Sequence, residues 1–115
     1  MSAQLEVPRL EDLSDIGVGV EPSDQPGVVS LVAWANDGST VTLTWDEIAG
    51  SASIRWLNGD EVRLVLERET PVKISVRDER GVIEFHVWSR WEGMGGELVV
   101  RVGEHVAVHD TLLRT

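Results

Sequence analysis

Ser75, Glu84 and His86 are residue types that together carry out nucleophilic hydrolysis, and they lie close together on a predicted hairpin. With Ser75 opposite Glu84 and Lys73 opposite His86, a serine, a carboxylate and an imidazole share one sheet face. A triad also requires a cleft, an oxyanion site and a base oriented by a third group, and an open sheet face normally supplies none of these. We therefore predict no catalytic residues, and hydrolysis by Ser75, Glu84 and His86 is only a further alternative.

The metal-binding and phosphate-binding patterns in the sequence are incomplete. His105 and His109 are four residues apart, which in an extended strand is roughly 13 Å, too far for one ion. The acidic pairs 46–47 and 78–79 lie in predicted turns without the spaced oxygen ligands of a calcium loop. The glycine-rich residues 93–96 are not followed by the Lys-Ser/Thr pair of a phosphate-binding loop. We predict neither a metal site nor a cofactor.

Aromatic residues near the glycine-rich segment are the best candidates for binding. Trp88, Trp91 and Met94 lie within seven residues, and Trp88 shares the alternation of Glu84 and His86. An exposed tryptophan beside a flexible loop suits a protein interface or a stacking platform for a sugar or another flat ligand. In the alternative arrangement the loop folds back and buries both rings. The candidate partner- or ligand-binding residues are therefore His86, Trp88, Trp91 and Met94.

The composition excludes several classes of function. The 115 residues carry a net charge of −10, so neither nucleic acid nor an anionic membrane surface is an expected partner. The chain contains no cysteine, which excludes disulfides and thiolate sites and favours a reducing compartment. Residues 1–13 lack a basic segment followed by an apolar run, and no stretch approaches the length of a membrane span. We expect a cytoplasmic protein.

Residues 1–27 differ in character from the rest of the chain. They carry six acidic residues against one arginine, so half of the net charge of −10 lies there. Repeated prolines and glycines interrupt every apolar run in this segment. We predict an acidic, irregular N-terminal arm over residues 1–27 and a single all-β domain over residues 28–115. The arm is either poorly ordered or covers a sheet edge or a neighbouring subunit with Leu5, Leu10, Leu13 and Ile16.

The strongest structural signal is the pair of alternating apolar runs that flank Asn58-Gly59 in residues 52–66. A plain two-residue loop would place apolar and charged residues on one face, so we predict a three-residue loop with a bulge. The predicted inward residues are Ile54, Trp56, Val62, Leu64 and Leu66.

Residues 28–35 and 40–45 form a second alternating pair, which we predict to turn at Asp37-Gly38 through a two-residue type I′ turn. This register pairs Trp34 with Val41 and leaves Leu31 on the opposite, outward face. The predicted inward residues are Val32, Trp34, Val41, Leu43 and Trp45.

Two more hairpins follow towards the end of the sequence. Residues 72–77 and 82–88 pair through a predicted four-residue loop that places Ile74 opposite Phe85. Residues 97–109 alternate either as one long strand kinked at Gly103 or as a hairpin that turns there, and we favour the hairpin. Four successive hairpins predict an all-β fold of about eight antiparallel strands, either a β-sandwich or a flattened barrel.

The lack of a complete catalytic set favours a non-catalytic protein-interaction module, accessory or inhibitory, that uses an acidic surface and the Trp/Met/Gly loop. The net charge of −10 favours a basic protein as the partner. A small-ligand or carbohydrate-binding module that uses Trp88 and Trp91 is the alternative. Outward Leu31, Leu57 and Val65, together with the arm, are compatible with a homodimer.

Overall fold

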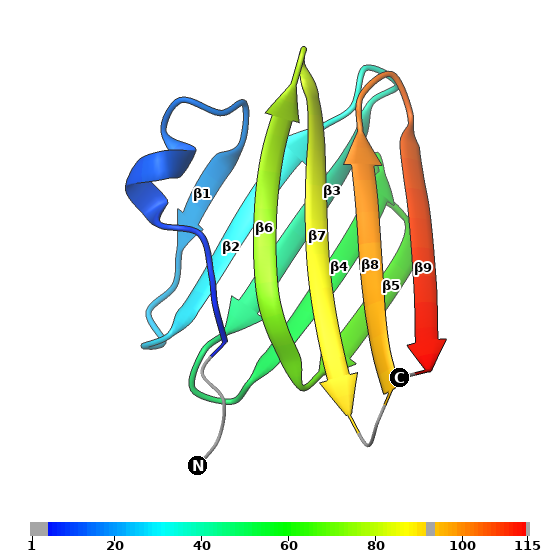
Figure 1. Cartoon of the computed structure of the whole chain (residues 1–115). Coiled ribbons are helices and arrows are strands. Elements are labelled where there is room, and N and C mark those ends of the chain that lie inside the picture. The colour runs from blue at the N-terminus through cyan, green and yellow to red at the C-terminus, as the bar shows by residue number, and fades with distance from the viewer. Residues whose placement is uncertain (1–4, 92–93, 115) are drawn as a thin grey trace.

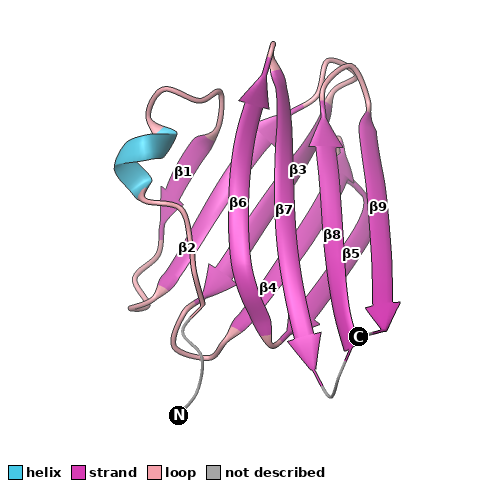
Figure 2. Ribbon diagram, viewed as in Figure 1, coloured by secondary structure: helices cyan, strands magenta, loops and turns pink. Residues whose placement is uncertain are grey.

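Nine strands form two antiparallel sheets in the computed structural model, which describes residues 5–91 and 94–114 (Figures 1 and 2). The five-stranded sheet has the order β1-β2-β3-β4-β5, and the four-stranded sheet has the order β6-β7-β8-β9. The elements are a 3-10 helix η1 (Leu10–Leu13), β1 (Gly19–Pro22), β2 (Val28–Trp34), β3 (Ser39–Asp46), β4 (Ser51–Asn58), β5 (Glu61–Glu69), β6 (Pro71–Glu79), β7 (Val82–Trp91), β8 (Met94–Val102) and β9 (Val106–Arg114). The predicted β-sandwich is confirmed, and within the described residues the sheets do not close into a barrel. Among these residues no helix is long and apolar enough to span a bilayer.

The two sheets bury a shared layer of apolar side chains, because one face of each strand points at the opposite sheet. The alternation is regular along β3, where Ser39, Val41, Leu43 and Trp45 are buried and the residues between them are partly exposed. The buried side chains of the four-stranded sheet include Ile74, Phe85, Val87, Leu98, Val100 and Val102. Each fully buried aliphatic or phenyl side chain contributes about 1.5–3 kcal/mol before the entropy of ordering it is subtracted.

The predicted face of β2 is wrong by one residue. Leu31 pairs with Leu43, and Ala33 is the residue opposite Val41. Leu31 and Ala33 are therefore buried, whereas Trp34 is 59% exposed. The inward predictions for Val32 and Trp34 and the outward prediction for Leu31 are wrong, while Val41 and Leu43 are in the core as predicted.

Contacts between loops account for this register. Residues 35–38 connect β2 to β3, and the N–H of Ala35 donates to the carbonyl of Ser39 at 2.9 Å. The turn itself therefore spans residues 36–38, one residue more than predicted. The N–H of Asn36 donates to the carbonyl of Gly103 at 2.8 Å, and the N–H of Asp37 donates to that of Glu104 at 3.1 Å. These acceptors lie in the β8–β9 loop, which turns at Gly103 as predicted. Because side chains alternate with a period of two, one extra loop residue exchanges the two faces of β2.

The β4–β5 hairpin has the predicted bulge in a different place. Its inward face holds four of the five residues predicted for it, namely Ile54, Trp56, Leu64 and Leu66. The chain turns through Gly59 and Asp60 alone. The register shifts between the pairs Trp56–Leu64 and Leu57–Val62, so Arg63 is the extra residue of the bulge. A two-residue turn with a bulge in the strand replaces the predicted three-residue loop. The predicted inward position of Val62 is wrong, because this residue precedes the bulge and is 47% exposed.

The β6–β7 hairpin turns through Arg80 and Gly81, which both have positive φ, 53° and 85°. This geometry suits a two-residue turn, so the predicted four-residue loop is wrong. Strand pairing shifts by two residues, and Ile74 faces Val87 instead of Phe85. Since two residues are one full period of a strand, the side chains keep their predicted faces.

Part of the segment 1–27 is built into the sandwich. β1 pairs with β2 at one end of the five-stranded sheet. Glu6 pairs with the edge of β6, where its N–H donates to the carbonyl of Val72 at 3.1 Å. Leu13 is 2% exposed, and Leu5 and Ile16 pack against the core, whereas Leu10 is 50% exposed. The segment therefore covers the β6 edge, which would otherwise offer unpaired backbone groups.

Replacement of Leu13 by alanine measures how much stability the N-terminal segment provides. Removal of a side chain that is 2% exposed leaves a cavity, so Leu13→Ala should lower the free energy of unfolding by about 2–5 kcal/mol. The matched control is Leu10→Ala, at a side chain that is 50% exposed, which should cost less than about 1 kcal/mol. Urea denaturation followed by tryptophan fluorescence measures both values. If Leu13→Ala lowered the free energy of unfolding as little as Leu10→Ala does, the side chain of Leu13 would not contribute to the core.

Candidate functional site

The candidate site lies on the outward face of β7 and of its neighbours β6 and β8. Phe85 and Val87 are buried between the sheets, so Glu84, His86 and Trp88 lie on the opposite face of the strand. This face is the one that the sequence predicted to carry polar and aromatic side chains. The central strand of the site is thus oriented by the apolar residues that alternate with the polar ones.

The pairs across β6 and β7 differ from the predicted pairs. Ser75 lies opposite His86, and Lys73 lies opposite Trp88. The predicted pairs, Ser75 with Glu84 and Lys73 with His86, are wrong because the hairpin turns through two residues instead of four. The shift brings a lysine beside a tryptophan and moves the serine away from the carboxylate.

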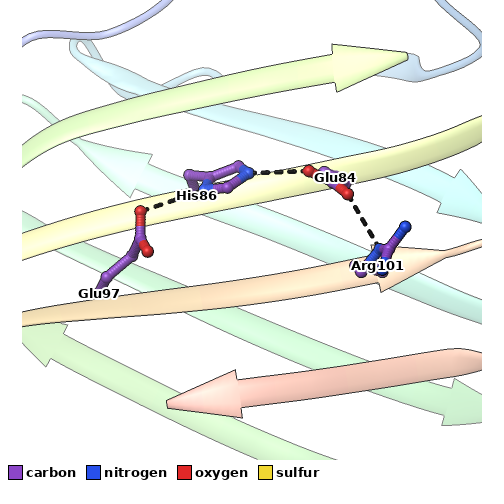
Figure 3. A network of polar contacts seen from close by, with 4 residues as sticks. All are labelled: Glu84, His86, Glu97 and Arg101. Atoms are coloured by element: carbon purple, nitrogen blue, oxygen red, sulfur yellow. Dashed lines mark hydrogen bonds and ion pairs between the residues drawn. The ribbon is translucent and has the colours of Figure 1, made fainter. Parts of the chain in front are cut away.

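His86 is at the centre of a chain of polar contacts that crosses from β7 to β8 (Figure 3). Its Nε2 lies 3.0 Å from Oε1 of Glu84, and its Nδ1 lies 3.3 Å from Oε2 of Glu97. The second carboxylate oxygen of Glu84 lies 2.9 Å from Nε of Arg101. An ionised carboxylate can only accept a hydrogen bond. His86 therefore makes hydrogen bonds to both carboxylates only when both of its ring nitrogens carry a hydrogen.

Glu84 is held in its ionised form by these neighbours. The hydrogen bond with His86 lowers the pKa of Glu84, and the charges of Arg101, His86 and Arg77 lower it further, which together outweigh the effect of desolvation. The side chains of Glu84 and His86 are only 14% and 15% exposed. An ionised carboxylate at this position keeps both the imidazole and the guanidinium in fixed orientations.

Trp88 extends the row of ordered side chains. Its ring stacks on the imidazole of His86, with 5.3 Å between centroids and 18° between planes. The ammonium group of Lys73 lies 5.3 Å from the centroid of the Trp88 ring. A cation–π contact at an exposed site contributes about 0.5–1 kcal/mol. These two contacts hold the indole in place on the sheet face.

Two of the four predicted binding residues are therefore in direct contact, His86 and Trp88. The other two, Trp91 and Met94, pair with each other where β7 meets β8. Their side chains lie outside the described part of the structure. Their role in binding stays a prediction.

The geometry does not form the triad considered from the sequence. Both ring nitrogens of His86 face carboxylates, so neither is directed at Ser75, the serine of the predicted triad. A general base must lie within hydrogen-bond reach of the nucleophile that it activates. In residues 5–91 and 94–114, no group of three or more His, Cys, Asp or Glu side chains is arranged to hold a metal ion.

Glu97 and Arg101 belong to the site but are not among its predicted residues. They alternate with the buried residues Leu98 and Val100, so their parity alone places them on the outward face. β8 pairs with β7 so that Glu97 faces Trp88. The alternation pattern could have identified both residues once β7 and β8 were taken as neighbouring strands.

No known protein family matches the chain, and no curated protein matches it. One solved structure with a similar fold is a chain of a contact-dependent growth inhibition toxin–immunity protein complex from Klebsiella pneumoniae 342. The two chains superimpose with a TM-score of 0.77 at 11% sequence identity, over 98% of this chain and 100% of the other. The likeness covers the whole sandwich. It establishes a shared fold.

Glu84→Gln tests the electrostatic role of Glu84 in the site. A folded-state pKa below the unfolded value of about 4.3 means that the ionised carboxylate stabilises the fold above that pH. The contribution disappears as the pH falls through the folded-state pKa. We expect Glu84→Gln to lower the stability by about 1.5 kcal/mol or more at pH 7, with a difference from wild type that shrinks towards pH 3.

Thermal unfolding of both proteins between pH 3 and pH 7 measures this difference. Glu61→Gln is the matched control, because its carboxylate is 67% exposed and lies 3.6 Å from Arg63. This control should show little change at any pH. A deficit of Glu84→Gln that is the same at pH 3 and pH 7 would contradict the assigned role.

Proposed function

We propose that this protein is a non-catalytic interaction module, accessory or inhibitory, which binds another protein through the outward face of β6, β7 and β8. The observation that carries the proposal is the row Lys73, Trp88, His86, in which two ring contacts order the side chains on an open sheet face. Tryptophan and arginine are frequent among the residues that dominate binding energy in protein interfaces. Arg101, at 53% exposure and held by Glu84, lies on the same face.

Ordering of these side chains before binding favours affinity. A flexible side chain loses about 0.5–1.5 kcal/mol of rotamer freedom when an interface immobilises it. Here the contacts with Glu84 and His86 already restrict Arg101 and Trp88 in the free protein. A partner that covers this face therefore orders fewer groups than it would on a mobile surface.

The fold likeness supports a protein as the partner. The solved structure with the similar fold is described as a complex of a toxin and an immunity protein. An inhibitory role, in which this chain covers a surface of a target protein, is the form of the proposal that this likeness favours. The net charge of −10 favours a target with a basic surface, since opposite charges accelerate encounter and exclude wrong partners.

The cytoplasm is the compartment that we propose, since the chain has no cysteine and its stability depends on no disulfide. The carbohydrate-binding alternative is less favoured. The ring of Trp88 is stacked on His86 and has Lys73 over it, so its faces are less available to a sugar.

Capture of a partner and a titration with two tryptophan variants test the proposal. The tagged protein is used to isolate a partner, which is then purified and titrated by calorimetry. Trp88→Ala should weaken binding by about 30-fold or more, as expected for a central interface residue. The control is Trp34→Ala, at the 59% exposed tryptophan of the other sheet, which should change the affinity less than about threefold.

Salt and activity provide two further readouts of the same complex. An increase from 50 mM to 300 mM salt should weaken binding to a basic partner. Stoichiometric addition of the protein should also reduce the activity of an inhibited target. A stronger effect of Trp34→Ala than of Trp88→Ala would contradict the proposed face, and a lack of any specific protein partner would contradict the proposed function.

A further inference from the structure

The two sides of the sandwich, where the edges of the sheets lie, differ in how they are covered (Figure 1). On one side, the N-terminal segment covers the edge of β6 through backbone bonds of Glu6. On the other side, β5 and β9 end the two sheets, and no described segment pairs with the outer edge of either strand. A cavity of about 550 Å³ opens between the sheets there, and its wall includes the buried residues Val87, Ser89 and Leu98. The sandwich is therefore closed on one side and open on the other.

Three of the four sheet edges carry a feature that prevents pairing with another chain. Such features include a very short strand, a bulge, charged side chains and a covering segment. β1 has four residues and ends at Pro22, and the edge of β6 is covered by Glu6. β5 has a bulge at Arg63, and more than half of its nine residues are charged. These three edges are therefore protected.

The edge of β9 lacks this protection over residues 106–109, which contain no proline, carboxylate, lysine or arginine. β9 has nine residues, and its pairing with β8 continues without a bulge. The next residue, Asp110, is charged but is paired with Arg68. Val106 and Val108 pack against the core and are only partly buried. β9 thus offers a continuous row of unpaired backbone groups beside apolar side chains that can be covered further.

We propose that β9 pairs with an extended segment of another protein, which adds a fifth strand to the four-stranded sheet. The backbone of this segment bonds to the outer edge of β9 over residues 106–110, and its alternate side chains point towards the opening between the sheets. Those inward side chains are apolar and uncharged. They extend the layer to which Val106 and Val108 belong, and the opening attracts no charge because Arg68 and Asp110 neutralise each other there.

The charge of the chain indicates which protein supplies the strand. Two copies of this chain, each with a net charge of −10, repel each other. A segment of another protein with basic residues on both sides of its apolar stretch is attracted instead. We therefore assign the edge to a basic partner and not to a second copy.

Titration with a synthetic strand tests the proposal. The peptide acetyl-Lys-Val-Thr-Val-Thr-Val-Lys-amide alternates valine and threonine between two lysines. Its counterpart, acetyl-Lys-Val-Pro-Pro-Pro-Val-Lys-amide, has no backbone N–H at its central positions. In amide NMR spectra, the first peptide should slow hydrogen exchange at alternate residues of 106–110, because every second N–H of an edge strand points away from its neighbour. The proline peptide should bind about tenfold more weakly or less.

Two variants locate the pairing on β9. Val108→Lys places a charge on the inward side of the edge, which opposes strand pairing, and should weaken binding of the valine–threonine peptide by about tenfold or more. Val65→Lys adds the same charge at a 53% exposed position of β5 and should change the affinity less than about threefold. The melting temperatures of both variants show whether the fold is retained.

Four results would overturn the assignment. The first is equal affinity for the two peptides, and the second is unchanged exchange along β9 with millimolar valine–threonine peptide. The third is slowed exchange along β5 or β7 in place of β9. The fourth is a dimer in sedimentation of the chain without peptide, with β9 amides protected as the protein concentration rises, which would assign the edge to a second copy.

All four results come from the wild-type chain, so they decide the question even if Val108→Lys does not fold. Strand addition at β9 requires no contact with Trp88. Its test is therefore independent of the proposed function, which depends on the outward face of β6, β7 and β8.

Discussion

The apolar layer between the two sheets is the constraint on which the other features of this protein depend. Every strand has a side-chain period of two, so the inward position of Phe85 and Val87 determines that Glu84, His86 and Trp88 point outward. The same layer takes up one face of each remaining strand, and the loop lengths decide which residues occupy that face, as at β2. The outward row on β7 and the buried hydroxyl of Ser89 are opposite consequences of one alternation.

Local alternation predicted the sandwich, the four hairpins and the outward face of β7, because each depends on residues that are near one another in the sequence. It failed at β2, where Asp37-Gly38 fits both a two-residue turn and a three-residue loop. The choice depends on bonds from Asn36 and Asp37 to the distant β8–β9 loop. The strand β1 has four residues, too few for a periodic signal.

The candidate site shows the same division between local and distant information. The shared face of His86 and Trp88 follows from parity within one strand. Their partners Glu97 and Lys73 come from neighbouring strands, and the register that brings each of them to the site depends on turn lengths. Those lengths were ambiguous in the sequence, so the contact between Lys73 and Trp88 and the carboxylates on both sides of His86 appear only in the folded chain.

The central claim is that the outward face of the four-stranded sheet, and not that of the five-stranded sheet, contacts a protein partner. Hydroxyl-radical footprinting of the free protein and of its complex tests this most directly, since Trp88 lies on the outer face of the four-stranded sheet and Trp34 on that of the five-stranded sheet. We predict that the complex protects Trp88 from oxidation and leaves Trp34, which is 59% exposed in the free chain, as reactive as before. Protection of Trp34 with unchanged oxidation of Trp88 would contradict it.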